Sequence, residues 1–216
     1  MISKQSEIDS KTEIFLKFIL DNYKTFDEFI TNIKKYHIKE ELLYDNILEN
    51  NIDYDNYFES LSEVINKYFY NPYEFDINKE LLLEVNKLIN NEYNFRDKNI
   101  IHRHFLHEVS DYKEIDKEVD NIFNKFNNND YTTLENYCFL IYNLYQIYPF
   151  LNALALRFIG NIYLLKNDYL PLFLSTRFKS EYYYIFQYDF SRFKESFFEL
   201  ILKNLDFLAE NLGLSK

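Results

Sequence analysis

The scarcity of glycine constrains the fold of this chain more than any other feature of its sequence. Only 2 of the 216 residues are glycine, Gly160 and Gly213, and they lie far apart. Tight turns between β-strands favour glycine because they need positive φ angles, so a β-rich fold is disfavoured. P-loops and dinucleotide-binding turns need several closely spaced glycines, so the chain lacks both kinds of phosphate-binding loop.

Apolar side chains recur at helical spacing along almost the whole chain, which predicts a single, mainly α-helical bundle. We expect one compact domain, in which N-terminal helices (1–59) cover a core (60–216). A hydrophobic fraction of 47% excludes disorder as the main state. The apolar positions predict helices in the ranges 14–23, 26–33, 42–48, 58–69, 81–89, 115–126, 176–190 and 191–212. They also predict two central helices that are broken at Tyr148-Pro149, the second of which ends at Tyr169-Leu170-Pro171.

Several short segments predict where helices end. The Asn71-Pro72 pair breaks the chain, and 127–130 is expected to form a loop before a helix capped by Thr132 or Thr133. Pro149 separates two apolar helices, because the residue before a proline avoids the α-helical region. A short apolar alternation predicts a β-hairpin near residues 95–107.

The charge balance excludes some partners. The chain carries 35 acidic and 24 basic residues, a net charge of −11. Nucleic acids and anionic membranes attract proteins through lysine and arginine, so neither is an expected partner. The stretch Tyr137–Leu165 is very apolar, but polar residues interrupt it, so we expect a protein core and no membrane span. With the lone Cys138 and a polar N-terminus, a cytoplasmic location is expected.

The centre of the chain resembles the Fic (Fido) family. The stretch 148–159 reads YPFLNALALRFI and corresponds to the family motif HPFx(D/E)GNGRxxR. A predicted helix (134–142) precedes it, and the segment 162–171 resembles the end of the family's following helix. Further matches at Arg177, Tyr182 and Tyr183 extend the resemblance over about 60–203. The resemblance implies a helical bundle with a short hairpin, in a family that transfers AMP from ATP to a target hydroxyl.

The positions that carry chemistry in that motif are all changed in this chain. Tyr148 stands at the position of the family's histidine base, and its phenol is a poor base near neutral pH. The neutral Asn152 stands at the position of the acidic residue that holds Mg²⁺ in the family. Ala153, Leu154 and Ala155 replace the Gly-Asn-Gly segment that exposes backbone N–H groups to phosphate.

Both motif arginines are also replaced, the first by Leu156 and the last by Ile159. The nearby Arg157 lies about 100° further round the helix, so it does not simply substitute. Pro149 and Phe150, the structural pair of the motif, are retained. We therefore expect weak or absent binding of ATP and Mg²⁺, no metal site, and loss of AMP transfer.

Two further segments match other parts of the family. Glu49 and Asn50 fit an inhibitory helix of the pattern (S/T)xxxE(G/N), although Asp45 replaces its Ser/Thr and Ile159 removes its arginine partner. The segment before the family's target-docking hairpin is matched by Arg96, Asn99, Ile100 and Ile101.

Four other features each have a functional and a structural interpretation. A cluster of histidines with one carboxylate comprises His102, His104, His107 and Glu108. It is either a zinc site or part of a polar hairpin, and the polar hairpin is preferred. Cys138 is expected to be a buried structural thiol. Arg157 either forms an ion pair in the core, with Glu49 or Glu181, or is the remnant of an anion site. The run Tyr182–Tyr184 either forms a partner surface or only reflects the codon bias of an AT-rich genome.

Three hypotheses of function follow. The first is a degenerate Fic-fold protein that binds a protein partner, receiving its edge along 97–106 by β-augmentation. The alternative is a divergent transferase of nucleotides or other phosphate compounds, in which Tyr148, Asn152 and Arg157 act. The third is an unrelated helical scaffold.

Overall fold

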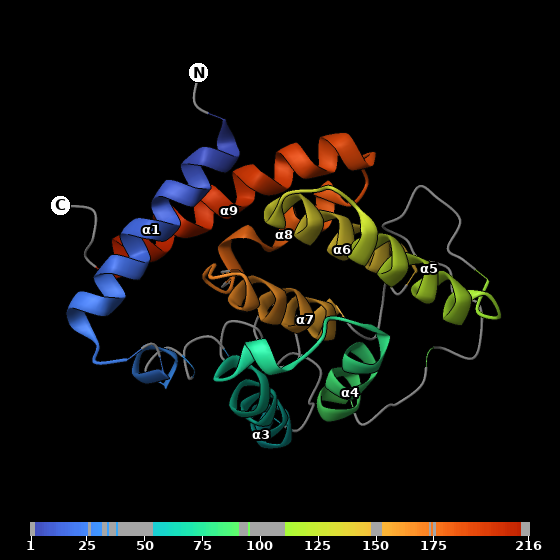
Figure 1. Ribbon diagram of the computed structural model, residues 1–216, viewed down its shortest axis with the longest axis horizontal. Helices are drawn as coiled ribbons and strands as arrows, with labels where there is room; N and C mark the ends of the chain where they lie inside the picture. The colour runs from blue at the N-terminus through green and yellow to red at the C-terminus, as the bar shows by residue number, and fades with distance from the viewer. Residues whose placement is uncertain are drawn as a thin grey trace.

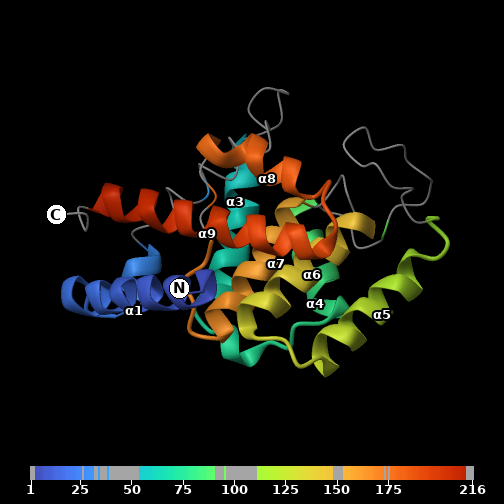
Figure 2. The same cartoon turned by 90° about the horizontal axis from the view of Figure 1, so that it is seen from above.

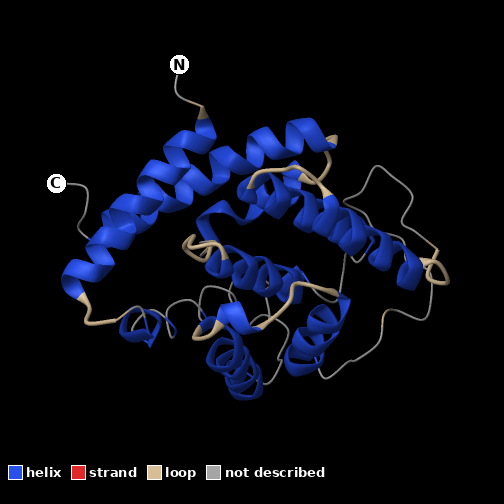
Figure 3. Cartoon of the chain, viewed as in Figure 1, coloured by secondary structure: helices blue, strands red, loops and turns tan. Residues whose placement is uncertain are grey.

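A computed structural model describes residues 3–25, 27–31, 34, 38, 54–90, 95, 111–147, 153–172, 174 and 176–212. These residues are mainly helical, and no β-strand occurs among them (Figure 3). The long helices are α1 (Lys4–Asn22), α3 (Tyr54–Val64), α4 (Lys79–Asn90), α5 (Ile115–Asn128), α6 (Thr133–Ile147), α7 (Ala153–Lys166), α8 (Lys179–Ile185) and α9 (Phe190–Leu212). The predicted mainly α-helical class is confirmed, whereas the predicted hairpin, apart from Phe95, lies outside the described residues.

Helix α7 lies at the centre of the fold (Figures 1 and 2). It packs against α6 on one side and against α4 on the other, and α5 and α9 in turn pack against α6. Its buried apolar side chains point in all directions around the helix, as is typical of a helix enclosed by protein. They are Leu154, Ala155, Leu156, Phe158, Ile159, Ile162, Leu164 and Leu165.

The described parts of the most apolar stretch of the sequence thus lie mainly in the core, as predicted. Within the described ranges, no helix combines the length and the apolar character that a membrane crossing requires. Helix α6 ends at Ile147 and α7 begins at Ala153, which agrees with a break between the two central helices. Helix α7 ends at Lys166, before the predicted end at 169–171, because the N–H of Tyr169 bonds back to the carbonyl of Leu164 and closes the last turn.

Helix α1 lies along α9 and joins the two ends of the chain (Figure 2). Lys4 Nζ lies 2.6 Å from Glu199 Oε1, and Lys11 forms a second ion pair with Asp206. Ser3 caps α1 by accepting a hydrogen bond from the backbone N–H of Ser6 at 3.2 Å. The helix therefore begins well before the predicted apolar segment 14–23, because this cap and its contacts with α9 favour helix in a polar sequence.

The start of α6 is fixed by a capping box. Thr132 Oγ1 accepts a hydrogen bond from the backbone N–H of Glu135 at 3.3 Å, and Glu135 Oε2 accepts one from the N–H of Thr132 at 3.3 Å. These bonds satisfy backbone donors that have no partner within the helix. Of the two caps predicted, Thr132 is the one used.

The loop predicted at 127–130 begins two residues later than expected. Asn127 and Asn128 are the last residues of α5. The Asn128 side chain donates to the carbonyl of Asn124 at 2.7 Å, so a residue typical of loops instead satisfies a carbonyl of the final helical turn.

The helix predicted at 58–69 changes geometry before it ends. Helix α3 passes into a π-helical turn, η2 (Ile65–Phe69), which buries Tyr68 and Phe69. The chain then breaks at Asn71-Pro72, as predicted, and Pro72 begins the short 3-10 helix η3 (Pro72–Glu74). This turn brings the residues around 69–73 next to the end of α7.

The two helices predicted over 176–190 and 191–212 are separated by a turn that the sequence pattern did not predict. The first begins as the 3-10 helix η4 (Thr176–Phe178) and continues as α8, which ends at Ile185. Turn hydrogen bonds run from the N–H of Gln187 and Tyr188 to the carbonyls of Tyr184 and Ile185. Helix α9 then begins at Phe190.

Candidate functional site

The first described turns of α7 form an apolar part of the core. Leu154 is 4% exposed, and both Ala155 and Leu156 are fully buried. Apolar side chains offer no hydrogen bond to a phosphate oxygen. Leu154, Ala155 and Leu156, at the positions of the glycine-rich part and the first arginine of the motif, therefore pack in the core and offer no side-chain ligand to an anion.

Ile159, at the position of the last motif arginine, is also fully buried. An inhibitory glutamate would need a cation at this position, and isoleucine provides none. Glu49 itself lies outside the described residues. The other predicted site residues outside them are Asn50, Arg96, Asn99, Ile100, Ile101, Tyr148, Pro149, Phe150 and Asn152, together with His102, His104, His107 and Glu108.

Arg157 places a charge within this apolar helix. Its side chain is 2% exposed, and burying a guanidinium requires polar partners. Arg157 does interact with other groups of the protein, while its buried Nη1 atom makes no hydrogen bond within the described residues. Of its two predicted partners, Glu181 lies 2.6 Å from Lys203 Nζ at the surface, and Glu49 is not described.

Cys138 of α6 is fully buried, and burial raises the pKa of its thiol well above the ordinary range. A nucleophilic cysteine needs exposure and a lowered pKa, so the structural interpretation is confirmed. Among the described residues, no group of three or more His, Cys, Asp or Glu side chains is arranged to hold a metal ion.

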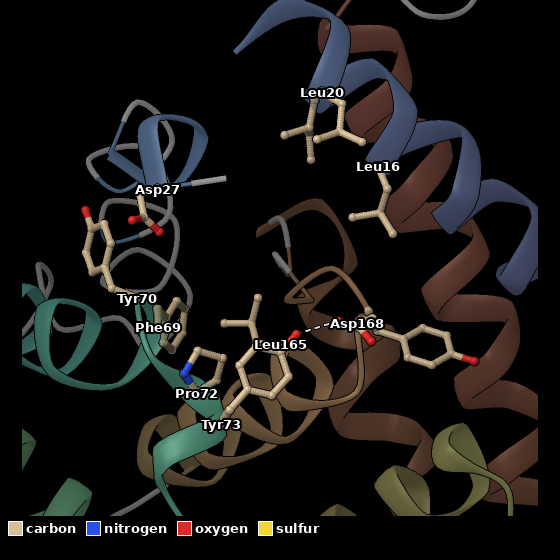
Figure 4. A pocket seen from close by; sticks show the side chains of 11 residues that line it. Leu16, Leu20, Asp27, Phe69, Tyr70, Pro72, Tyr73, Leu165 and Asp168 are labelled. Atoms are coloured by element: carbon tan, nitrogen blue, oxygen red, sulfur yellow. Dashed lines mark hydrogen bonds between the residues drawn. The ribbon is translucent and has the colours of Figure 1, made fainter. Parts of the chain in front are cut away.

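A pocket of about 400 Å³ lies at the opposite, C-terminal end of α7, and sequence reasoning missed it (Figure 4). Its walls come from α1, from Asp27, from the segment 69–73 and from the segment 165–169. These parts are far apart in the sequence. The one local signal was the Asn167-Asp168 pair, which follows α7 where a glycine usually ends a helix.

The backbone at Asp168 explains the shape of this end of α7. The N–H of Asp168 bonds to the carbonyl of Leu165 at 3.2 Å, and the N–H of Tyr169 bonds to that of Leu164 at 2.9 Å. This Schellman arrangement places Asp168 at a φ of 61°, a left-handed conformation in which glycine is usual. The turn directs the Asp168 carboxylate to Tyr73, whose hydroxyl donates a hydrogen bond to it.

The comparisons with known proteins identify the fold. No protein-family model matches the sequence, and no curated protein matches it. The arrangement of its helices is that of the Fic fold. It is similar to the crystal structure of a Fic family protein from Desulfovibrio desulfuricans G20, with a TM-score of 0.62 and 13% sequence identity, over 98% of this chain and 75% of that one. The Fic-like helical part of the expected fold is thus confirmed, and an identity of 13% extends the likeness to fold alone.

Proposed function

We propose that this chain is a degenerate Fic-fold protein that has lost AMP transfer and acts by binding a protein partner. The observation that carries the proposal is the replacement of the phosphate ligands at the start of α7 by a buried apolar face. Leu154, Leu156 and Ile159 are between 0% and 4% exposed in a chain whose fold is similar to that of a Fic family protein. Such a helix start stabilises the core and offers no side-chain ligand to a nucleotide.

An aromatic surface supports the protein-binding part of the proposal. Tyr131 and Tyr184 are 45% and 54% exposed. Ring contacts connect Tyr131 to Phe190 at 6.3 Å and Tyr184 to Tyr188 at 5.4 Å, and Arg192 stacks on Tyr188 at 3.8 Å. Exposed tyrosines and arginines are enriched at protein interfaces. Within the predicted run 182–184, Tyr184 is the exposed member, whereas Tyr182 is buried.

In this proposal the partner also pairs with the segment 97–106 by β-augmentation, as the resemblance to the target-docking hairpin implies. Arg96, Asn99, Ile100 and Ile101 would hold that edge. The net charge of −11 favours a partner with a basic surface. ATP and Mg²⁺ are not part of this function.

The competing function is a divergent transferase that uses Arg157, and the buried charge of that residue is the observation in its favour. The two functions are separated by incubating the full chain with ATP labelled at the α-phosphate, in the presence of Mg²⁺. We expect no more label on the chain, or on added proteins, than on the heat-unfolded chain.

An Arg157→Met variant is the matched control, because methionine fills a similar volume without charge. Its circular dichroism must first show that it folds. Labelling of the wild-type chain that is lost in the folded variant would overturn the proposal and establish the transferase.

A further inference from the structure

The pocket at the C-terminal end of α7 has the size and lining of a small-molecule site. Its volume of about 400 Å³ falls within the range of about 300–1,000 Å³ that ligand pockets occupy. Leu16 and Leu20 of α1, Phe69, Pro72 and Leu165 give it mainly apolar walls. These walls can take up the hydrocarbon part of a ligand.

The charged side chains that line the pocket are both acidic. Asp27 and Asp168 lie on different sides of it (Figure 4), and both are exposed to solvent. No described lysine, arginine or histidine lines it. The pocket therefore repels phosphates and carboxylates and attracts cations, an effect that the net charge of −11 reinforces.

Asp168 is held in place by its surroundings. The hydroxyl of Tyr73 donates a hydrogen bond to its Oδ1 atom, and its backbone lies in the left-handed turn that ends α7. The C-terminal end of α7 also carries the negative end of the helix dipole, which favours a cation at the same place.

Aromatic rings complete the lining. Tyr70 and Tyr73 both line the pocket (Figure 4), and the negative face of a tyrosine ring attracts ammonium groups. Apolar walls, tyrosine rings and two carboxylates are the combination that suits an organic ammonium group attached to a hydrocarbon body.

We propose that this pocket binds a small organic ammonium compound of that kind. The proposal goes beyond the proposed function and does not rest on it, because the pocket and the start of α7 are at opposite ends of the helix. The pocket at the C-terminal end of α7 favours cations, whereas the start of α7 is apolar, so a ligand of one site is not expected to bind at the other.

The test measures binding of three probes of the same shape to the full chain by ligand-observed NMR. The probes are 4-phenylbutylammonium, the neutral 4-phenylbutan-1-ol and the anionic 4-phenylbutyrate. We expect saturable binding of the ammonium compound, at least about fivefold weaker binding of the alcohol, and no binding of the carboxylate.

Asp168→Asn and Asp27→Asn locate the site. Each variant keeps the size of the side chain, and the amide oxygen that Asp168→Asn introduces can still accept the hydrogen bond from Tyr73. Each should weaken binding of the ammonium compound about fivefold and leave binding of the alcohol unchanged. Asp130→Asn, at an exposed position in the α5–α6 loop, makes the same change in net charge and should have no effect.

Three results would overturn the proposal. They are the absence of saturable ammonium binding, equal affinity for the ammonium compound and the alcohol, and an affinity that the two pocket variants leave unchanged. None of these results bears on AMP transfer, so the two proposals fail separately.

Discussion

Gly160 of α7 lies directly against the ring of Tyr137 of α6. A Cβ atom on Gly160 would lie 2.5 Å from Cε2 of Tyr137 and 2.9 Å from Cδ1 of Ile141. Tyr137 is 2% exposed, so its ring has little room to move. The close approach of the two central helices therefore depends on a residue without a side chain.

Gly160→Ala should destabilise the protein. Overpacking a core lowers the free energy of unfolding by about 1–3 kcal/mol. We expect a loss at the upper end of this range, because the added methyl group would make two short contacts. The better helix propensity of alanine returns up to about 1 kcal/mol. We expect the free energy of unfolding, measured in urea, to fall by about 2 kcal/mol.

The background variant Tyr137→Leu tests the cause of that loss. Leucine leaves room for the added methyl group, so the cost of Gly160→Ala should shrink in the double variant. An equal cost in both backgrounds would show that the ring of Tyr137 is not the obstacle.

Thr132→Ala should lower the free energy of unfolding by about 1 kcal/mol, because it removes the cap of α6. Thr132→Ser keeps a hydroxyl that can accept the hydrogen bond from the N–H of Glu135. The free energy of unfolding of this variant should therefore stay near that of the wild type. Thermal unfolding of the three proteins side by side measures the difference. If Thr132→Ser lowered the free energy of unfolding as much as Thr132→Ala does, the capping hydrogen bond would not be the cause of the loss.

The ion pair of Glu135 with Lys194 should make stability depend on pH. The bond from Lys194 holds the pKa of Glu135 below its ordinary value of 4.5. Because the folded pKa is the lower one, this stabilisation is complete above about pH 4.5 and is lost as the pH falls through the folded pKa. Glu135→Gln, which can still complete the capping box, should cost about 1 kcal/mol at pH 7 and progressively less in acid.

Glu181→Gln is the control for that experiment. The pair of Glu181 with Lys203 has a similar separation of 2.6 Å but is more exposed to solvent, so its effect at pH 7 should be smaller. If Glu135→Gln lowered the free energy of unfolding equally at pH 7 and in acid, the ion pair of Glu135 with Lys194 would not be the source of the pH dependence.

The thiol of Cys138 should react slowly in the native protein. It is fully buried, and burial raises its pKa, so reaction with a thiol reagent requires the protein to open. The rate measured with Ellman's reagent should rise steeply with urea and match that of a free thiol once the chain is unfolded. A fast reaction without urea would show that α6 is accessible.

Helical periodicity was sufficient to predict most of the core. The apolar positions in α4, α5 and α6 correspond to buried faces, because their spacing follows the helical period. The same pattern gave no sign of the π-helical turn at 65–69 or of the first turns of α1. The first turns of α1 are stabilised by the Ser3 cap and by contacts with a distant segment, such as the ion pair of Lys4 with Glu199.

The candidate site was predictable only at one end of α7. Its start could be compared with the Fic motif residue by residue, since the motif is continuous in the sequence. The pocket at the other end is built from α1, Asp27, the segment 69–73 and the end of α7, and no local pattern connects Asp27 with Asp168. Only the tertiary fold brings them together.

The central question is whether the start of α7 still binds a nucleotide. Isothermal titration calorimetry of the full chain with ATP and Mg²⁺, and separately with pyrophosphate and with a CDP-linked compound, tests this most directly. We expect no saturable heat at ligand concentrations up to about 1 mM, equivalent to a binding free energy weaker than about 4 kcal/mol. Saturable binding of ATP that disappears in a folded Arg157→Met variant would contradict this expectation.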